Sequence, residues 1–316
     1  MITVQNLVKR YGDTVAVDGV TFTVERGEVL GFLGPNGAGK TTTMRILTTF
    51  IPPDEGTANL AGFDVRRQPL DVCRRVGYLP ENAPLYLDMG TVDYLLYVAE
   101  MRGIPRPEMR GRVKKVVDVC GLGPALAKNI GQLSKGFRQR VGLAQAMVHE
   151  PDILILDEPT SGLDPNQIVE IRSLIKEIGR EKTVILSTHI LPEVSATCGR
   201  VIIIANGKLV GSGTPESLAS QAVGGVGVNV VLRGNGDDIE GGLKTLDVAD
   251  RVQFVGAESD ALRYRVQARD GVDPGRLGEA VSGLAATRGW RLRELRPEGA
   301  SLEDVFRELT TREDGA

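Results

Sequence analysis

Eight residues that follow a short apolar run have the spacing of a phosphate-binding loop: Gly34-Pro35-Asn36-Gly37-Ala38-Gly39-Lys40-Thr41. The preceding run, Val29–Leu33, is typical of a strand buried on both faces of an α/β sheet. We expect a helix over residues 40–47, with its N-terminus and the glycine N–H groups facing the phosphates. Lys40 is predicted to reach the β- and γ-phosphates, and the Thr41 hydroxyl to bind Mg²⁺.

An acidic pair ends a second apolar run. Ile153–Leu156 is followed by Asp157 and Glu158, which places two carboxylates at the carboxyl end of a predicted strand. We expect Asp157 to hold Mg²⁺, directly or through water, and Glu158 to polarise the attacking water. An acidic pair after a strand is by itself usually a solvated loop. In a chain that also carries a phosphate-binding loop, the catalytic interpretation is favoured.

Composition excludes several other classes. With 38 Lys and Arg against 41 Asp and Glu, the net charge is -3, so we expect no nucleic-acid partner. The three cysteines are far apart and form no CxxC pair, which disfavours a disulfide scaffold and a zinc ribbon and fits a reducing compartment. The two histidines are too few for a His-rich metal site. The longest apolar runs are strand-sized, so we expect no membrane span and no signal segment.

Periodicity predicts an α/β chain with two domains. β-branched runs indicate strands at 4–8, 15–17, 20–24, 153–156 and 183–186. Helical spacing covers about 81–148, with a candidate cap at Thr91, and a second helix begins at Asp164-Pro165. Asn206-Gly207 indicates a type I′ hairpin between residues 202–205 and 208–210. We predict one domain over 1–220 and a small α+β domain over 221–316. The second contains a hinge at 224–227, strands at 228–232 and 262–266, and helices at 277–287 and 302–309.

Taken in order, these motifs resemble the nucleotide-binding subunits of ABC transporters over roughly residues 1–220. Residues 34–42 resemble that family's Walker A motif, 155–160 its Walker B motif and 161–164 its D-loop. The resemblance implies a P-loop ATPase cassette with a mixed sheet, an antiparallel N-terminal part and a helical subdomain. It implies ATP and Mg²⁺ as ligands, with nucleotide contacts from Tyr11, Asn36, Gly37, Gly39, Lys40, Thr41 and Thr42. Tyr11 would stack on adenine, and His189 would contact the γ-phosphate as the switch histidine. Each also has a plainer interpretation: an exposed strand-end tyrosine and a structural histidine.

Two segments depart from the family pattern. The signature, usually Leu-Ser-Gly-Gly-Gln, reads Leu133-Ser134-Lys135-Gly136-Phe137 here. The resemblance implies that Ser134, Gly136 and Asp164 contact ATP held by the opposite subunit, although Asp164 could serve only as a helix cap. The family's Q-loop glutamine is replaced by Glu81, which could bind the metal through water or point into solvent; we favour the first. With the ending at residues 301–306, these variants resemble the ABC-2-type exporter ATPases, including the gliding-motility-associated and daunorubicin-resistance types.

The resemblance therefore implies an ATPase subunit that dimerises head to tail around two Mg-ATP. Such a subunit would drive separate integral-membrane permeases from the cytoplasmic face of the membrane. One alternative is a soluble ABC ATPase acting on a cytoplasmic machine, although those relatives typically carry two cassettes or long coiled-coil insertions. Another is a non-hydrolysing ATP-dependent scaffold, against which Glu158 and His189 argue. The sequence names no cargo.

Overall fold

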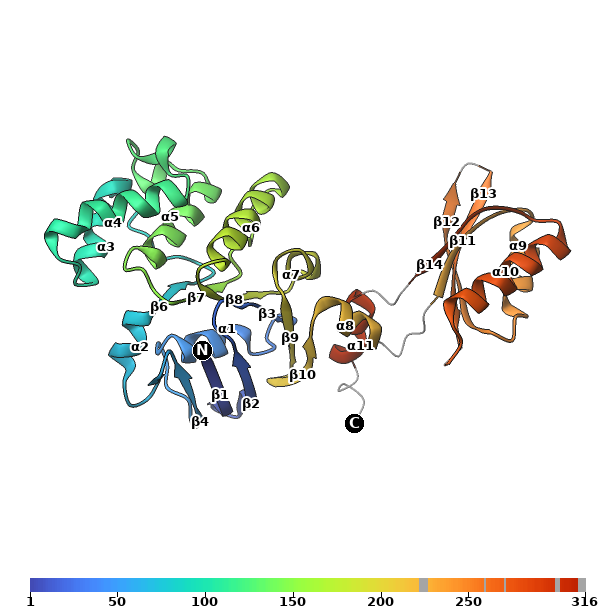
Figure 1. Ribbon diagram of the computed structural model, residues 1–316, viewed down its shortest axis with the longest axis horizontal. Coiled ribbons are helices and arrows are strands. Elements are labelled where there is room, and N and C mark those ends of the chain that lie inside the picture. Colours follow the sequence, from blue (N-terminus) through green and yellow to red (C-terminus); the bar gives the residue numbers. More distant parts are fainter. Residues whose placement is uncertain (222–226, 259, 270, 299–301, 312–316) are drawn as a thin grey trace. The chain divides into compact units, whose positions relative to one another are not determined.

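The computed structural model describes residues 1–221, 227–258, 260–269, 271–298 and 302–311. The chain divides into two compact units, Met1–Pro215 and Glu216–Ala316, which are coloured from blue to yellow and from yellow to red (Figure 1). This division lies five residues before the boundary expected from the sequence. Within the described residues, no helix is both long and apolar enough to cross a membrane.

An antiparallel sheet forms the N-terminal part of the first unit. Its strands run in the order β2-β1-β4-β5 and comprise β1 (Ile2–Tyr11), β2 (Thr14–Val24), β4 (Glu55–Leu60) and β5 (Phe63–Asp64). The sequence suggested two short strands at 15–17 and 20–24. They form one strand, because β2 stays paired with β1 through register shifts between Leu7 and Arg10.

A six-stranded sheet carries the predicted motifs. Its order is β10-β9-β3-β8-β7-β6, and all neighbouring pairs are parallel except β10 with β9. The strands are β3 (Val29–Leu33), β6 (Val76–Leu79), β7 (Ile153–Asp157), β8 (Thr183–Thr188), β9 (Arg200–Ala205) and β10 (Lys208–Gly213). The predicted strands at 29–33, 153–156 and 183–186 are confirmed. So is the type I′ hairpin, where Asn206 and Gly207 have φ of 46° and 78°.

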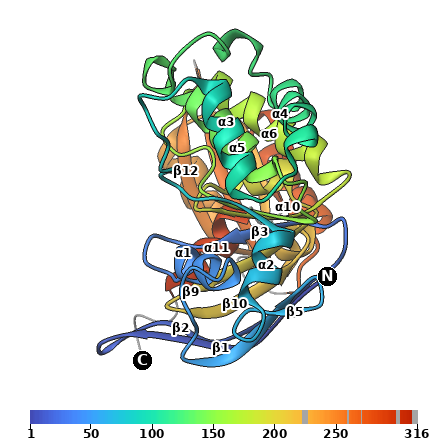
Figure 2. The same ribbon diagram turned by 90° about the vertical axis from the view of Figure 1, so that its left-hand side faces the viewer.

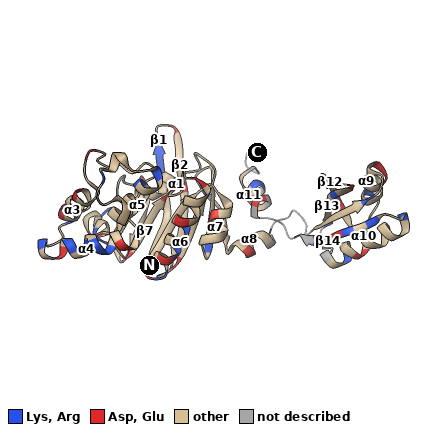
Figure 3. Cartoon of the chain, turned by 90° about the horizontal axis from the view of Figure 1, so that it is seen from above, with Lys and Arg blue, Asp and Glu red and all other residues tan. Residues whose placement is uncertain are grey.

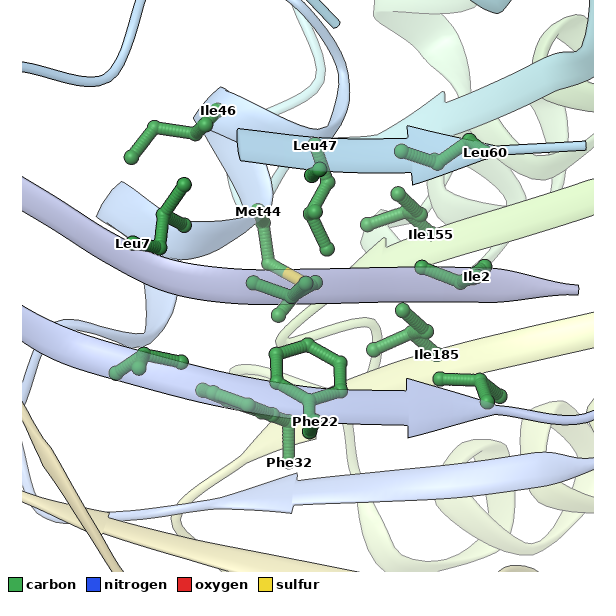
Figure 4. Packing of buried hydrophobic residues seen from close by; sticks show 14 of the residues in the cluster. Ile2, Leu7, Phe22, Phe32, Met44, Ile46, Leu47, Leu60, Ile155 and Ile185 are labelled. Carbon is green, nitrogen blue, oxygen red and sulfur yellow. The ribbon is translucent and has the colours of Figure 1, made fainter. Parts of the chain in front are cut away.

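Apolar side chains from both sheets meet in one core, which also anchors the helix after the phosphate-binding loop. Helix α1 (Lys40–Leu47) buries Met44, Ile46 and Leu47 against residues of both sheets, as Figure 4 shows. The Phe22 and Phe32 rings pack with centroids 5.6 Å apart. Each fully buried large aliphatic side chain contributes about 1.5–3 kcal/mol, so α1 is held firmly beneath the loop.

The remaining helices of the first unit are α2 (Pro69–Arg75), α3 (Thr91–Met101), α4 (Arg106–Val119), α5 (Lys135–Met147), α6 (Pro165–Gly179) and α7 (Leu191–Thr197). Figure 2 shows α3, α4 and α5 gathered together, as expected for the region 81–148. Thr91 is the first helical residue and not the cap, which is Gly90; the Thr91 hydroxyl donates to the Lys128 carbonyl. The many cations of α4 (Figure 3) include Arg112 and Lys115, which pair with acidic residues.

The second unit contains a four-stranded antiparallel sheet and two helices that pack against it. Its elements follow the order β11 (Gly227–Arg233), α9 (Gly236–Lys244), β12 (Ala249–Glu258), β13 (Ala261–Ala268), α10 (Pro274–Arg288) and β14 (Arg291–Glu298). The all-antiparallel strand order β12-β13-β11-β14 is that of the ferredoxin-like fold. Helices α8 (Pro215–Gln221) and α11 (Leu302–Thr311) complete the unit's described elements.

The sequence predicted β11, β13, α10 and α11 but not α9, β12 or β14. Strand β12 is mostly exposed, and β14 is rich in arginine and contains Pro297. On α11, Val305 is buried, and Phe306 and Leu309 are partly buried. The expected hinge residues 224–226 lie outside the described residues, and Gly227 begins β11.

Candidate active site

The loop between β3 and α1 has backbone angles that glycine provides. Gly37 and Gly39 have φ of 81° and 103°, in the left-handed region. A Cβ at Gly39 would lie 2.3 Å from the Ala16 carbonyl oxygen, so a larger residue would displace the loop. Gly39 also caps α1 without a side-chain hydrogen bond. The first N–H groups of the helix are therefore free of a capping side chain, an arrangement suited to an anion.

Lys40 is the first residue of α1, and its side chain is nearly buried, with 6% exposure. Its ammonium donates to the carbonyl oxygens of Gly34 at 2.7 Å and Pro35 at 3.2 Å. The same nitrogen lies 3.4 Å from Oε1 of Glu158. The loop carbonyls and Glu158 thus hold the lysine charge at the place where the sequence predicts phosphate.

Asp157 ends β7 and is fully buried. Its Oδ1 accepts hydrogen bonds from the Thr41 hydroxyl at 3.3 Å and from the Ser187 hydroxyl, whereas Oδ2 is buried without any partner. Burial raises the pKa of Asp157, and the nearby Glu158 carboxylate acts in the same direction, against the hydrogen bonds from Ser187 and Thr41. An unpartnered, buried carboxylate oxygen is costly. A cation at this position would remove that cost.

The oxygen donors of Asp157 and Thr41 suit Mg²⁺, which prefers a few hard oxygen ligands and completes its shell with water and phosphate. Among the described residues, no three or more His, Cys, Asp and Glu side chains gather into a metal cluster. Glu81 is thus not grouped with Asp157 and Glu158. It is exposed, but it lines the same cleft as Lys40.

Glu158 follows directly and has a left-handed backbone with φ of 48°, a conformation that costs energy for a non-glycine residue. Its N–H donates to the Ser187 carbonyl at 3.1 Å. Its carboxylate oxygens lie 2.9 and 3.0 Å from Nδ1 of His189, just past the end of β8. One carboxylate therefore contacts both Lys40 and His189, a bridge that the sequence did not predict.

Lys40, Thr41, Glu158 and His189 line a cleft of about 420 Å³, whereas the buried Asp157 is not among its lining residues. The volume is typical of small-molecule sites. The residues of the phosphate-binding loop and helix that were predicted to contact the nucleotide all line this cleft: Asn36, Gly37, Gly39, Lys40, Thr41 and Thr42. Ser161 of the expected D-loop also lines it, as does Ala16, which the sequence did not indicate. Tyr11 is not among the lining residues. It ends β1 with 48% exposure, and its ring centroid lies 5.9 Å from the Lys9 ammonium. Its adenine contact stays a prediction.

A second cleft, of about 450 Å³, holds Ser134, Gly136 and Asp164. Ser134 caps α5 by accepting from the Phe137 N–H at 3.3 Å, and Asp164 caps α6 by accepting from the Gln167 N–H at 2.9 Å. The cap at Asp164 is confirmed. A Cβ at Gly136 would lie 2.8 Å from the Gln167 side chain. The structure thus brings these three residues together, but in a different cleft from Lys40.

Sequence reasoning missed Ser187 in this region. The residue is fully buried in β8 and hydrogen-bonded to Asp157. Its only sequence signal is its position directly before Thr188-His189 at the end of an apolar run.

Comparison with protein families places these motifs in a known group. The profile described as "ABC transporter" matches residues 17–161. A second profile, described as "AAA domain, putative AbiEii toxin, Type IV TA system", matches residues 128–196, the segment that holds Ser134, Asp157 and His189.

Individual relatives match over most or all of the chain. The "ABC transporter ATP-binding protein NatA" of Bacillus subtilis is 38% identical over 69% of this chain and 91% of that protein. The "Nod factor export ATP-binding protein I" of Burkholderia lata is 33% identical over 98% of this chain and 96% of the relative. The "Daunorubicin resistance ATP-binding protein DrrA3" of Streptomyces coeruleorubidus is 37% identical over 73% of each chain.

A solved structure agrees with the fold. The CbiO1 protein of Clostridium perfringens, described as part of the ABC transporter complex CbiONQ, superposes with a TM-score of 0.64 at 29% identity. The match covers 70% of this chain and 90% of CbiO1.

Proposed function

We propose a function from the premise that this chain belongs to the ABC transporter family as an ATP-binding subunit and ATPase. Two copies dimerise head to tail around two Mg-ATP and power export through separate membrane subunits. The observation that carries the dimer is the separation of the two clefts within one chain. Ser134, Gly136 and Asp164 line one cleft and Lys40 lines another. In a head-to-tail dimer, the cleft lined by Ser134 in one copy would close over the cleft lined by Lys40 in its partner. Each ATP would then contact both sets of residues.

Within each site, the side chains divide the work of hydrolysis. The loop N–H groups and Lys40 bind the phosphates, and Asp157 with Thr41 would hold Mg²⁺, which neutralises phosphate charge when bound. Glu158 orients the attacking water and accepts a proton from it as a general base. His189, 2.9 Å from the Glu158 carboxylate, keeps that carboxylate in position and contacts the γ-phosphate.

Two of the relatives support an export role, because their names include "Nod factor export" and "Daunorubicin resistance". We accordingly place the chain at the cytoplasmic face of a membrane, bound to integral-membrane permease subunits. The alternative, an ATPase of a cytoplasmic machine, predicts no such partner. Co-purification from membranes with a multi-helix protein supports the first, and recovery only with soluble complexes supports the second.

The dimer is tested by sedimentation of the Glu158→Gln protein with and without ATP. ATP is expected to double the mass. Ser134→Arg is expected to prevent this, because a bulky cation would fill the cleft that Ser134 lines with Gly136 and Asp164. Ser173→Arg is the matched control, because Ser173 is exposed on α6 and lines neither cleft. A mass that ignores ATP, or a dimer that tolerates Ser134→Arg, contradicts the proposed arrangement.

A further inference from the structure

Ser187 lies behind the acidic pair and does not line the cleft. It belongs to β8, and its partner in the parallel register with β7 is Asp157. The side chain is fully buried. Any effect of its hydroxyl on the reaction must therefore pass through neighbouring groups.

The Ser187 hydroxyl contacts both members of the acidic pair. It donates its hydrogen to Oδ1 of Asp157, and its oxygen lies 3.3 Å from the Glu158 N–H, which also donates to the Ser187 carbonyl at 3.1 Å. If the hydroxyl is lost, the Glu158 N–H keeps its carbonyl partner. Asp157 then loses one of its two hydroxyl hydrogen bonds and keeps the longer one from Thr41, at 3.3 Å, while the Tyr78 hydroxyl also interacts with its carboxylate. The hydroxyl therefore matters most to Asp157.

The arrangement at Asp157 is asymmetric. Both hydroxyl donors meet at Oδ1, and Oδ2 has no partner. A hydrogen bond from a rigid strand restricts rotation of the carboxylate, and the second oxygen stays without a hydrogen bond from the protein. A strand is a suitable support, because its backbone is fixed by pairing on both sides: β8 pairs with β3 and with β7.

We propose that Ser187 is a positioning residue for the cation site, whose hydroxyl sets the orientation in which Asp157 presents its free oxygen to Mg²⁺. The inference rests on the proposed function, since it assumes a divalent cation at Asp157. Outer groups that orient a metal ligand typically change metal affinity by 10–100-fold when they are removed. Ser187→Ala is therefore expected to raise the half-saturating free Mg²⁺ concentration for hydrolysis by about 10-fold. Turnover at saturating Mg²⁺ should fall much less, because Glu158 keeps its main backbone contact.

The experiment pairs kinetics with a direct measurement of metal binding on the full chain. Mn²⁺ replaces Mg²⁺, and its dissociation constant in the presence of ADP is measured by electron paramagnetic resonance. Ser187→Thr keeps the hydroxyl and should restore binding to near that of the unmodified chain. Thr183→Val is the matched control: Thr183 is a nearly buried residue of the same strand, whose hydroxyl accepts from the Gly27 N–H at 2.9 Å. Urea unfolding of each variant reports structural damage separately.

The outcomes separate this inference from the function on which it rests. A weaker Mn²⁺ affinity in Ser187→Ala, with Thr183→Val unchanged, supports the proposal. Saturable Mn²⁺ binding with the same constant in the unmodified chain and in Ser187→Ala overturns the role of Ser187 and leaves the cation site intact. Absence of saturable Mn²⁺ binding in the unmodified chain overturns both.

Discussion

The Lys40 ammonium lies 3.4 Å from the Glu158 carboxylate, and both side chains are nearly buried. The residue expected to bind phosphate is thus paired with the residue expected to activate water. A phosphate that reaches Lys40 must compete with Glu158 for the same charge, and it also meets the repulsion of that carboxylate. Charge at Glu158 therefore opposes nucleotide binding and at the same time serves hydrolysis.

Glu158→Gln should lower ATP turnover by about 10²–10⁴-fold, the range for a lost acid–base group. ATP affinity should stay the same or increase, because the variant removes the negative charge beside Lys40. Phosphate release and calorimetric ATP binding measure the two effects. Near-normal hydrolysis would remove Glu158 from its assigned role.

Lys40→Ala should weaken ATP binding by about 10–100-fold, which corresponds to the 1.5–3 kcal/mol of a hydrogen bond to a charged group. The control is Lys208→Ala, because Lys208 is half exposed, pairs with Asp18 and does not line the cleft. ATP titration of both variants is the measurement. Equal ATP affinities of the two variants would contradict the binding of phosphate by Lys40.

Glu81→Ala should mainly reduce stimulation of hydrolysis by the membrane partner. Glu81 lines the cleft but is exposed. It can therefore contact both the bound nucleotide and a membrane partner, and so link hydrolysis to that partner. Glu81→Gln should change basal hydrolysis only modestly, because added attraction for the metal and added repulsion of the γ-phosphate oppose each other. If Glu81→Ala abolishes basal hydrolysis of the isolated subunit, Glu81 is catalytic.

A chain that ends at Pro215 should remain folded and bind ATP. Among the described residues, the apolar cluster that joins the two sheets of the first unit has no member after Leu209. The second unit has a core of its own around Tyr264 and Trp290. We expect the shortened chain to lose dimer lifetime or control by the partner. Size-exclusion chromatography and ATP titration test this. Aggregation or loss of ATP binding would show that the second unit is part of the cassette's fold.

The first unit should lose stability on mild acidification because of His149. Burial, together with the nearby Arg102 guanidinium, lowers the pKa of His149 to about 4, and Nδ1 is buried without a partner. Below about pH 6.5 the unfolded chain takes up a proton that the folded chain refuses until about pH 4, so the free energy of unfolding falls across that window. The loss from this group is about 2 kcal/mol between pH 7 and pH 5.

His149→Gln should abolish that part of the pH dependence while an amide hydrogen can still reach the Val76 carbonyl, the partner of Nε2 at 3.1 Å. Urea unfolding is followed by circular dichroism, because the single tryptophan, Trp290, reports only the second unit. The same acid sensitivity in the variant and in the unmodified chain would exclude His149 as its source.

Much of this site could be predicted from the sequence because its parts are local. The apolar run Val29–Leu33, the glycine loop and the helix from Lys40 are continuous in the chain. The acidic pair follows its own strand directly. Carboxyl ends of parallel strands meet at one edge of a sheet, so two such segments suffice to predict that Lys40 and Asp157 come together. The capping role of Asp164 is equally local.

Tertiary structure alone decided the contacts that depend on pairing between distant segments. The register of β7 with β8 places Ser187 beside Asp157, and the turn after β8 brings His189 to Glu158. The packing of α5 and α6 assigns Ser134 and Asp164 to their own cleft. Strand β12, whose residues are mostly exposed, exists because β13 supplies its hydrogen bonds. Periodicity records which face of a segment is buried, but register and side-chain neighbours are set by packing between segments far apart in sequence.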